Sequence, residues 1–127
     1  MKKYSQKQQI AFVKEMITTN KMWAQRALMR IFENQTQDER ILENTSHENG
    51  IGFTSHDAKL LTSFANSLEI YGSLTDKQMT YLYRFIGKYA RQLYKSPYFD
   101  KEKLNRIMEK SIWIWRRIKF SVFLYFN

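Results

Sequence analysis

Residues that interrupt helices are scarce in this chain, which has only four glycines and one proline among 127 residues. Long stretches without them, with apolar residues three and four positions apart, are typical of helical proteins. The length and the hydrophobic fraction of 43% fit one small globular domain over residues 1–127. The sequence therefore predicts a mainly α, single-domain bundle of about five helices.

Capping residues indicate where the helices begin. Ser5 with Gln8, and Thr75 with Gln78, match the capping box, in which two side chains satisfy free backbone N–H groups reciprocally. Asp100 is a further N-cap candidate. We expect a first helix from Ser5 to a break at Asn20, a second over 21–34 and a short one from a Thr36 cap through Leu42. A further helix is expected over 56–71, capped by Ser55 and ended by Gly72. Two more are expected over 76–95 and from Asp100 onward.

Two segments do not fit a regular helix. Residues 43–55 are polar and contain the turn signal Asn49-Gly50, so we expect an irregular loop, with Phe53 inserted into the core. The aromatic tail 112–127 alternates like a strand in places, and its structure stays open. It either extends the last helix or lies across the others. Burial against the domain or in a homodimer is favoured over a membrane surface, and Trp23, Trp113 and Trp115 are expected as core or interface anchors.

Positive charge is concentrated in the C-terminal part of the chain. Residues 1–76 hold nine Lys/Arg and nine Asp/Glu, whereas residues 77–127 hold twelve Lys/Arg and three Asp/Glu. The whole net charge of +9 therefore lies in the second segment. This asymmetry favours a polyanionic partner, nucleic acid first and an anionic membrane second.

Five of these cations share one face of the helix expected over 76–95. At about 100° per residue they fall within about 60° of arc, along a stripe of about 27 Å. Further cations follow in the next helix, and tyrosines flank the stripe and are candidates for base stacking. The alternative is an ordinary solvated helix face. The candidate nucleic-acid-binding residues are Lys77, Tyr81, Arg84, Lys88, Arg91 and Lys95, with Lys101, Lys103 and Arg106 beyond Pro97 and with Tyr83 and Tyr94 as further flanking tyrosines.

The sequence gives no pattern for catalysis. There is no cysteine for a disulfide or a thiolate metal site, and His47 and His56 match no closed zinc spacing. Without a nucleophile, a phosphate loop or a placed carboxylate pair, we expect no enzyme, no metal and no cofactor. The N-terminus lacks the features of a secretory signal, and the tail is too short and too charged to span a bilayer.

Residues 23–93 resemble a module found in phage and plasmid proteins of DNA metabolism, including phage helicases. The shared strings are Q-T-x-D-E, N-G-I-G-F, L-T-x-K-Q and K-Y-x-x-Q-L. The resemblance implies a loop signature of Asn49, Gly50, Gly52, Phe53 and Asp57, and a second set on the basic helix of Thr75, Lys77, Gln78, Lys88, Tyr89 and Gln92. This chain has no helicase motor and no P-loop, so the resemblance implies an accessory role only.

Two functions are expected on these grounds. The first is a phage or mobile-element accessory protein in the bacterial cytoplasm that binds nucleic acid, DNA foremost, without catalysis. The second is a phage inhibitor that binds a host protein complex, such as a CRISPR or other defence effector, with its basic face on an acidic surface. An enzyme built around His47, His56 and Asp57 is the third and weakest alternative.

Overall fold

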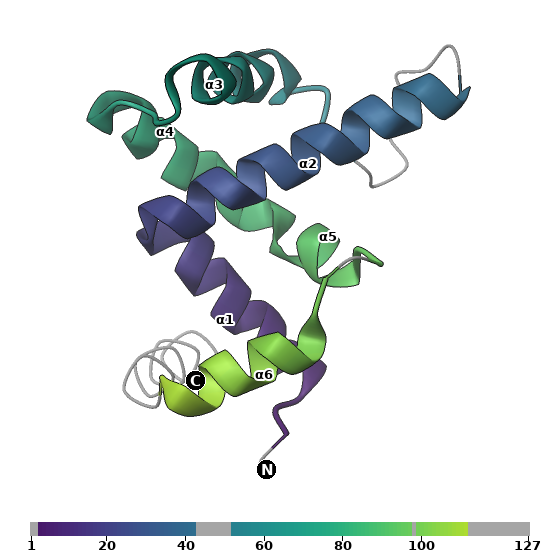
Figure 1. The fold of residues 1–127 in the computed structure, drawn as a ribbon, viewed down its shortest axis with the longest axis vertical. Coiled ribbons are helices and arrows are strands. Elements are labelled where there is room, and N and C mark those ends of the chain that lie inside the picture. The colour runs from purple at the N-terminus through teal and green to yellow at the C-terminus, as the bar shows by residue number, and fades with distance from the viewer. Residues whose placement is uncertain (1–2, 43–51, 98, 112–127) are drawn as a thin grey trace.

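The computed structural model describes residues 3–42, 52–97 and 99–111, and within these ranges it is helical, with no strand. The predicted mainly α fold is confirmed (Figure 1). The elements in chain order are α1 (Gln6–Thr19), α2 (Lys21–Leu42), α3 (Ala58–Tyr71), α4 (Asp76–Ile86), the 3-10 turn η1 (Gly87–Tyr89), α5 (Ala90–Lys95) and α6 (Lys101–Lys110).

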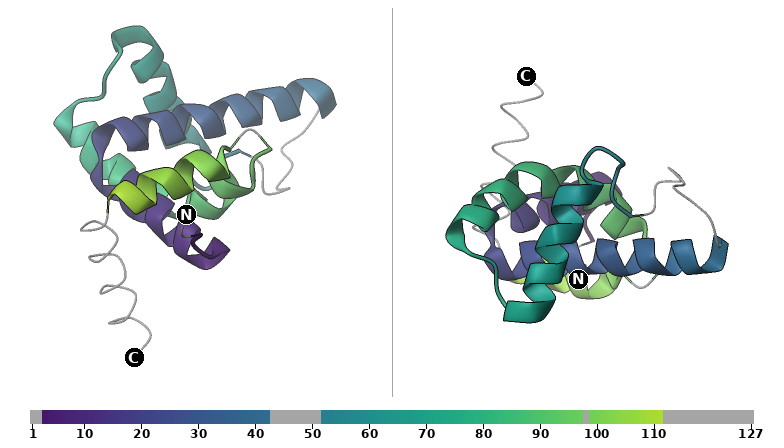
Figure 2. Two further views of the ribbon diagram at one scale, coloured as in Figure 1. Left: turned by 60° about the horizontal axis from the view of Figure 1, so that its bottom comes forward. Right: turned by 90° about the horizontal axis from the view of Figure 1, so that it is seen from above.

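Helix α1 holds the fold together, because it contacts α2, α4, η1, α5 and α6. Helices α3 and α6 lie at opposite ends of the molecule, with α1, α2 and α4 between them (Figure 1). The C-terminal part of α2 extends past the other helices (Figure 2). At the other end, the Tyr4 backbone N–H donates to the Asn105 side chain of α6 at 2.9 Å.

The core is formed by the apolar faces of these helices. Its largest fully buried side chains come from every α-helix except α5, so each of them contributes to one hydrophobic cluster. Burial of each such side chain typically contributes about 1.5–3 kcal/mol, which is why amphipathic helices this short are stable only when packed. These side chains are Phe12, Val13, Ile17, Leu28, Ile31, Leu61, Leu82, Ile86 and Met108.

The predicted caps explain several helix ends. The capping boxes Ser5/Gln8 and Thr75/Gln78 are both formed, and the Asp100 side chain accepts from the Lys103 N–H at 2.9 Å. Helix α3 ends at Gly72, whose φ of 76° is the left-handed conformation that favours glycine. Asn20 joins α1 to α2, because its backbone N–H caps α1 and its side chain accepts from the Trp23 N–H at 3.1 Å.

Three boundaries differ from those expected. Helix α2 runs without interruption to Leu42, so a separate helix from Thr36 is wrong, consistent with the absence of glycine and proline over 21–42. Helix α3 begins at Ala58 and has Asp57, not Ser55, at its N-cap position. The helix predicted over 76–95 is divided into α4, η1 and α5.

Some expectations fall on residues that are not described. The described ranges do not include His47 or, in the predicted loop, Asn49, Gly50 and Ile51. They also do not include the aromatic tail 112–127 with Trp113 and Trp115. Phe53 lies within them and is 8% exposed, in the core as predicted. Trp23 is half-buried, and its ring meets that of Phe12 edge to face with centroids 6.1 Å apart.

Candidate nucleic-acid interface

The segment α4–η1–α5 is amphipathic. Its inward side chains, which include Met79, Leu82, Ile86 and Leu93, are buried. The exposed side carries four cations that have no carboxylate partner among the described residues, and we call these four residues the basic face: Lys77, Arg84, Arg91 and Lys95.

The 3-10 turn η1 changes the geometry of this face. A 3-10 helix advances about 120° per residue instead of about 100°, so three such residues rotate α5 by about 60° relative to α4. Arg91 and Lys95 therefore do not continue the α-helical register of Lys77 and Arg84. The turn lies close to α1, since a Cβ added to Gly87 would stand 3.0 Å from Cγ2 of Thr18.

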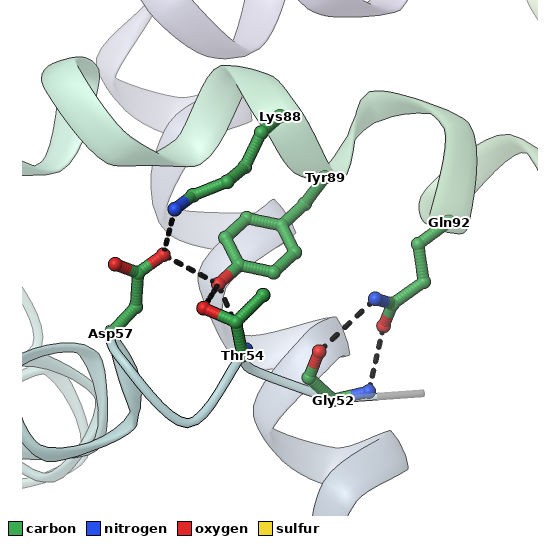
Figure 3. Close-up of polar contacts among 6 residues, drawn as sticks. All are labelled: Gly52, Thr54, Asp57, Lys88, Tyr89 and Gln92. Atoms are coloured by element: carbon green, nitrogen blue, oxygen red, sulfur yellow. Dashed lines mark hydrogen bonds and ion pairs between the residues drawn. The ribbon is translucent and has the colours of Figure 1, made fainter. Parts of the chain in front are cut away.

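Lys88 makes an intramolecular contact that the sequence did not predict. Its ammonium forms an ion pair with Oδ2 of Asp57, and the Tyr89 hydroxyl donates to the same oxygen at 2.7 Å (Figure 3). The Asp57 side chain is 3% exposed, whereas that of Lys88 is 47% exposed. Because the charge of Lys88 is balanced by this buried carboxylate, Lys88 is a structural cation and a weak candidate for phosphate contact.

The contacts of Asp57 also set its protonation. Burial acts to raise the pKa of the Asp57 carboxyl, but hydrogen bonds from Lys88 and Tyr89 and the positive charge of Lys88 hold that pKa below its ordinary value of 3.8. Burial is also the main reason why the pKa of Tyr89 is raised above its ordinary value of 10.0. At neutral pH the cluster therefore contains the Asp57 carboxylate and the neutral Tyr89 phenol.

Gln92 and Tyr89 fasten the segment before α3 to η1 and α5. The Gln92 side chain accepts from the Gly52 N–H at 2.8 Å and donates to the Gly52 carbonyl at 3.0 Å (Figure 3). The Tyr89 hydroxyl accepts from the Thr54 N–H at 3.1 Å. With the ion pair of Asp57 and Lys88, these contacts form what we call the loop clamp.

Helix α2 holds the other side of this segment. The Gln35 side chain accepts from the Phe53 N–H at 3.0 Å. The Phe53 ring stacks on Phe32, with centroids 6.5 Å apart, and meets Tyr89 edge to face at 6.0 Å. Residues 52–57 are thus held between α2 and the η1–α5 segment by both polar and aromatic contacts.

The loop clamp brings together residues from separate strings of the sequence pattern. Gly52, Phe53 and Asp57 come from the loop signature, and Lys88, Tyr89 and Gln92 come from K-Y-x-x-Q. These two groups of residues contact one another, so this part of the pattern holds the fold together, whereas Lys77 of the same pattern is exposed. The spacing of Gln92 from Lys88 and Tyr89 is the signal for this, because side chains four and three positions apart are neighbours on a helix surface.

The predicted tyrosines separate into two kinds. Tyr81 is 40% exposed and has the Arg84 guanidinium 5.4 Å from its ring centroid, beside the basic face. Tyr94, expected to flank the stripe, is 5% exposed, and its hydroxyl donates to the Gln9 side chain. Tyr94 is therefore a core residue and is not available for stacking on a base, and Tyr83 is half-buried.

The cations of α6 are exposed but lie apart from α4. Lys101 has its ammonium 4.6 Å from the centroid of the Tyr94 ring. Lys103 lines a recess with Arg26 and Arg30 of α2. Arg106 is exposed and has no ion-pair partner in the part of the chain that the structure covers.

The described residues contain no group of three or more His, Cys, Asp or Glu side chains placed to hold a metal ion. His56 is exposed next to buried Asp57. None of the helices in the described ranges combines the length and the apolar character that crossing a membrane requires.

Comparisons with known proteins returned no match, neither to a protein-family model, nor to a curated protein, nor to a solved structure.

Proposed function

We propose that this protein binds nucleic acid without catalysis, through the basic face and the adjacent Tyr81. The observation that carries the proposal is the grouping of four exposed cations of one sign, Lys77, Arg84, Arg91 and Lys95, on the outer side of α4 and α5. A helix face that is only exposed to water is solvated equally well by a mixture of positive and negative side chains, so it does not require charges of one sign. Cations near phosphates gain affinity by releasing condensed counterions, whatever the base sequence.

The loop clamp supports this role indirectly. It holds residues 52–57 against η1 and α5 and thereby fixes the direction of the segment that carries the basic face. A preformed array of cations loses less conformational freedom on binding than a mobile one. The role matches an accessory protein of phage or mobile-element DNA metabolism, in the cytoplasm of a bacterial host.

Reversing the charge of basic-face residues that take no part in the loop clamp tests the proposed nucleic-acid binding. The double variant Lys77→Glu/Arg84→Glu should bind a labelled DNA oligonucleotide at least about tenfold more weakly, since two phosphate contacts become repulsive. The matched control is Lys21→Glu/Lys59→Glu, which makes the same change in net charge on α2 and α3. Equal affinity for the two variants contradicts the proposal. Lys88→Glu is unsuitable, because it would leave Asp57 beside a second carboxylate.

A second function is favoured by another surface. Near the end of α3, Ile70 and Tyr71 are 72% and 78% exposed, which is unusual for two consecutive large apolar side chains. This supports the alternative of a phage inhibitor that binds a host protein complex such as a defence effector, with the contact made by this apolar pair in place of the basic face expected from the sequence. Capture of a host protein that survives nuclease treatment, and is lost in Ile70→Ser/Tyr71→Ser but not in Lys77→Glu/Arg84→Glu, would favour it over nucleic-acid binding.

A further inference from the structure

A recess lies between α2 and α6, apart from α4 and from the two basic-face residues on α4, Lys77 and Arg84. It has a volume of about 320 Å³ and receives residues from α1, α2, α5 and α6 and from the turn before α6. Figure 2 (left) shows α6 in front of α1 and α2. Ligand pockets typically begin at about 300 Å³. The recess is therefore of the size of a small-ligand site.

The floor of the recess is apolar. Val13, Ile17 and Leu104 are at most 2% exposed, and Ala27 and Leu93 are nearly as buried. Trp23, Phe99 and Ile107 are half-buried at its sides. An apolar ligand body would cover the exposed parts of these three side chains, and that burial would favour binding by about 25 cal/mol per Å².

The rim of the recess is cationic. Its charged lining residues are Arg26, Arg30 and Lys103, with Asp100 as the one carboxylate. The Asp100 side chain is already engaged, because it accepts from the Lys103 backbone N–H at 2.9 Å. Arg30 also lies 4.0 Å from Glu33, an exposed pair of the kind that is weak in water. The rim therefore has a surplus of positive charge above an apolar floor.

From this pairing of an apolar floor with a cationic rim we propose that the recess binds a small amphipathic anion, a free carboxylate with an acyl chain of medium length. The chain would lie against the half-buried side chains of Trp23, Phe99 and Ile107, and the carboxylate would meet Arg26 and Lys103 at the rim. A neutral ligand would leave the cations unused, and an amphipathic cation would be repelled. The site goes beyond nucleic-acid binding and assigns Lys103 to a ligand other than phosphate.

The test uses the full chain with decanoate below its micelle concentration, and measures affinity by calorimetry and the location by NMR. We expect saturable binding, with shifts confined to the Trp23 indole N–H and the Ala27 and Ile107 methyl groups. Decanol should bind at least about tenfold more weakly, since it lacks the charge that Arg26 and Lys103 attract. No saturable binding, equal affinity for decanol, or shifts centred on another face would overturn the proposal.

Two sets of variants locate the determinants. Arg26→Gln/Lys103→Gln should weaken decanoate binding about tenfold, whereas the control Lys21→Gln/Lys59→Gln removes two positive charges elsewhere and should leave it unchanged. Ala27→Leu should fill the recess and abolish binding, with its thermal transition checking that the protein still folds. Equal loss in both double variants contradicts the rim assignment. Capture by anionic vesicles without any binding of free decanoate would mean that a lipid surface is the occupant, and would also overturn the proposal.

Discussion

The Lys88 ammonium of η1 is paired with the Asp57 carboxylate, which is 3% exposed at the N-cap position of α3. This pair connects the loop segment to the α4–η1–α5 segment, which carries the basic face. It also divides the cations of that segment into one with a structural role and four that remain available to a ligand.

Removal of Lys88 should destabilise the fold. Lys88→Met removes the cation beside the buried Asp57 carboxylate and leaves the hydrogen bond from the Tyr89 hydroxyl, and an unpaired buried charge typically costs about 3–5 kcal/mol. Because half of the Lys88 side chain is in water, we expect about 1–3 kcal/mol in urea unfolding. Lys77→Met, on the same side of the segment but unpaired in the described structure, is the control and should change stability by less than about 0.5 kcal/mol. A similar loss in both variants would contradict the assignment.

The ion pair of Asp57 and Lys88 should also make the free energy of unfolding depend on pH in the acidic range. The pKa of Asp57 is below 3.8 in the folded protein, so the stabilisation is fully present above 3.8 and is lost as the pH falls through the folded pKa. Asp57→Asn does not titrate. The difference in free energy of unfolding between wild type and Asp57→Asn should therefore shrink below about pH 4 and be constant between about pH 5 and 8. A difference that does not change with pH in acid would show that the carboxylate charge contributes nothing.

Gly52 should tolerate substitution less well than Gly72. Both have positive φ, 84° and 76°. A Cβ on Gly52 would stand 2.6 Å from Cβ of Gln35, whereas one on Gly72 meets nothing within 4 Å. Gly72→Ala should cost about 1–2 kcal/mol for the left-handed backbone alone. Gly52→Ala should cost more than that, because α2 or the loop must shift, and equal thermal transitions for the two variants would disprove the close approach.

The exposed ring of Tyr81 should favour single strands. Stacking of a base on an aromatic ring contributes about 1–3 kcal/mol, and paired bases are not available for it. Tyr81→Ala should lower affinity for single-stranded DNA by about 5- to 100-fold and leave duplex binding nearly unchanged, while Tyr81→Phe should retain the affinity. Tyr71→Ala removes a tyrosine that is 78% exposed on α3 and serves as the control. If both tyrosine variants lose affinity equally, stacking at Tyr81 is not the cause.

Local signals predicted much of the fold. The capping boxes at Ser5 and Thr75 and the end of α3 at Gly72 depend on a few neighbouring residues, and the structure has all three. The break at η1 involves the approach of Thr18 to Gly87, and the pairing of Asp57 with Lys88 joins residues far apart in sequence. Helical periodicity contains no information about such tertiary contacts, and for the same reason it placed Tyr94 on the surface although it is buried against Gln9.

The salt dependence of DNA binding tests the proposed function most directly. With phosphate contacts from Lys77, Arg84, Arg91 and Lys95, the slope of log K against log salt concentration should be about −3 to −4. Replacing Arg91 and Lys95 by Gln should reduce that slope to about half. A slope near zero for the wild-type protein, or an unchanged slope in Arg91→Gln/Lys95→Gln, would contradict binding through the basic face.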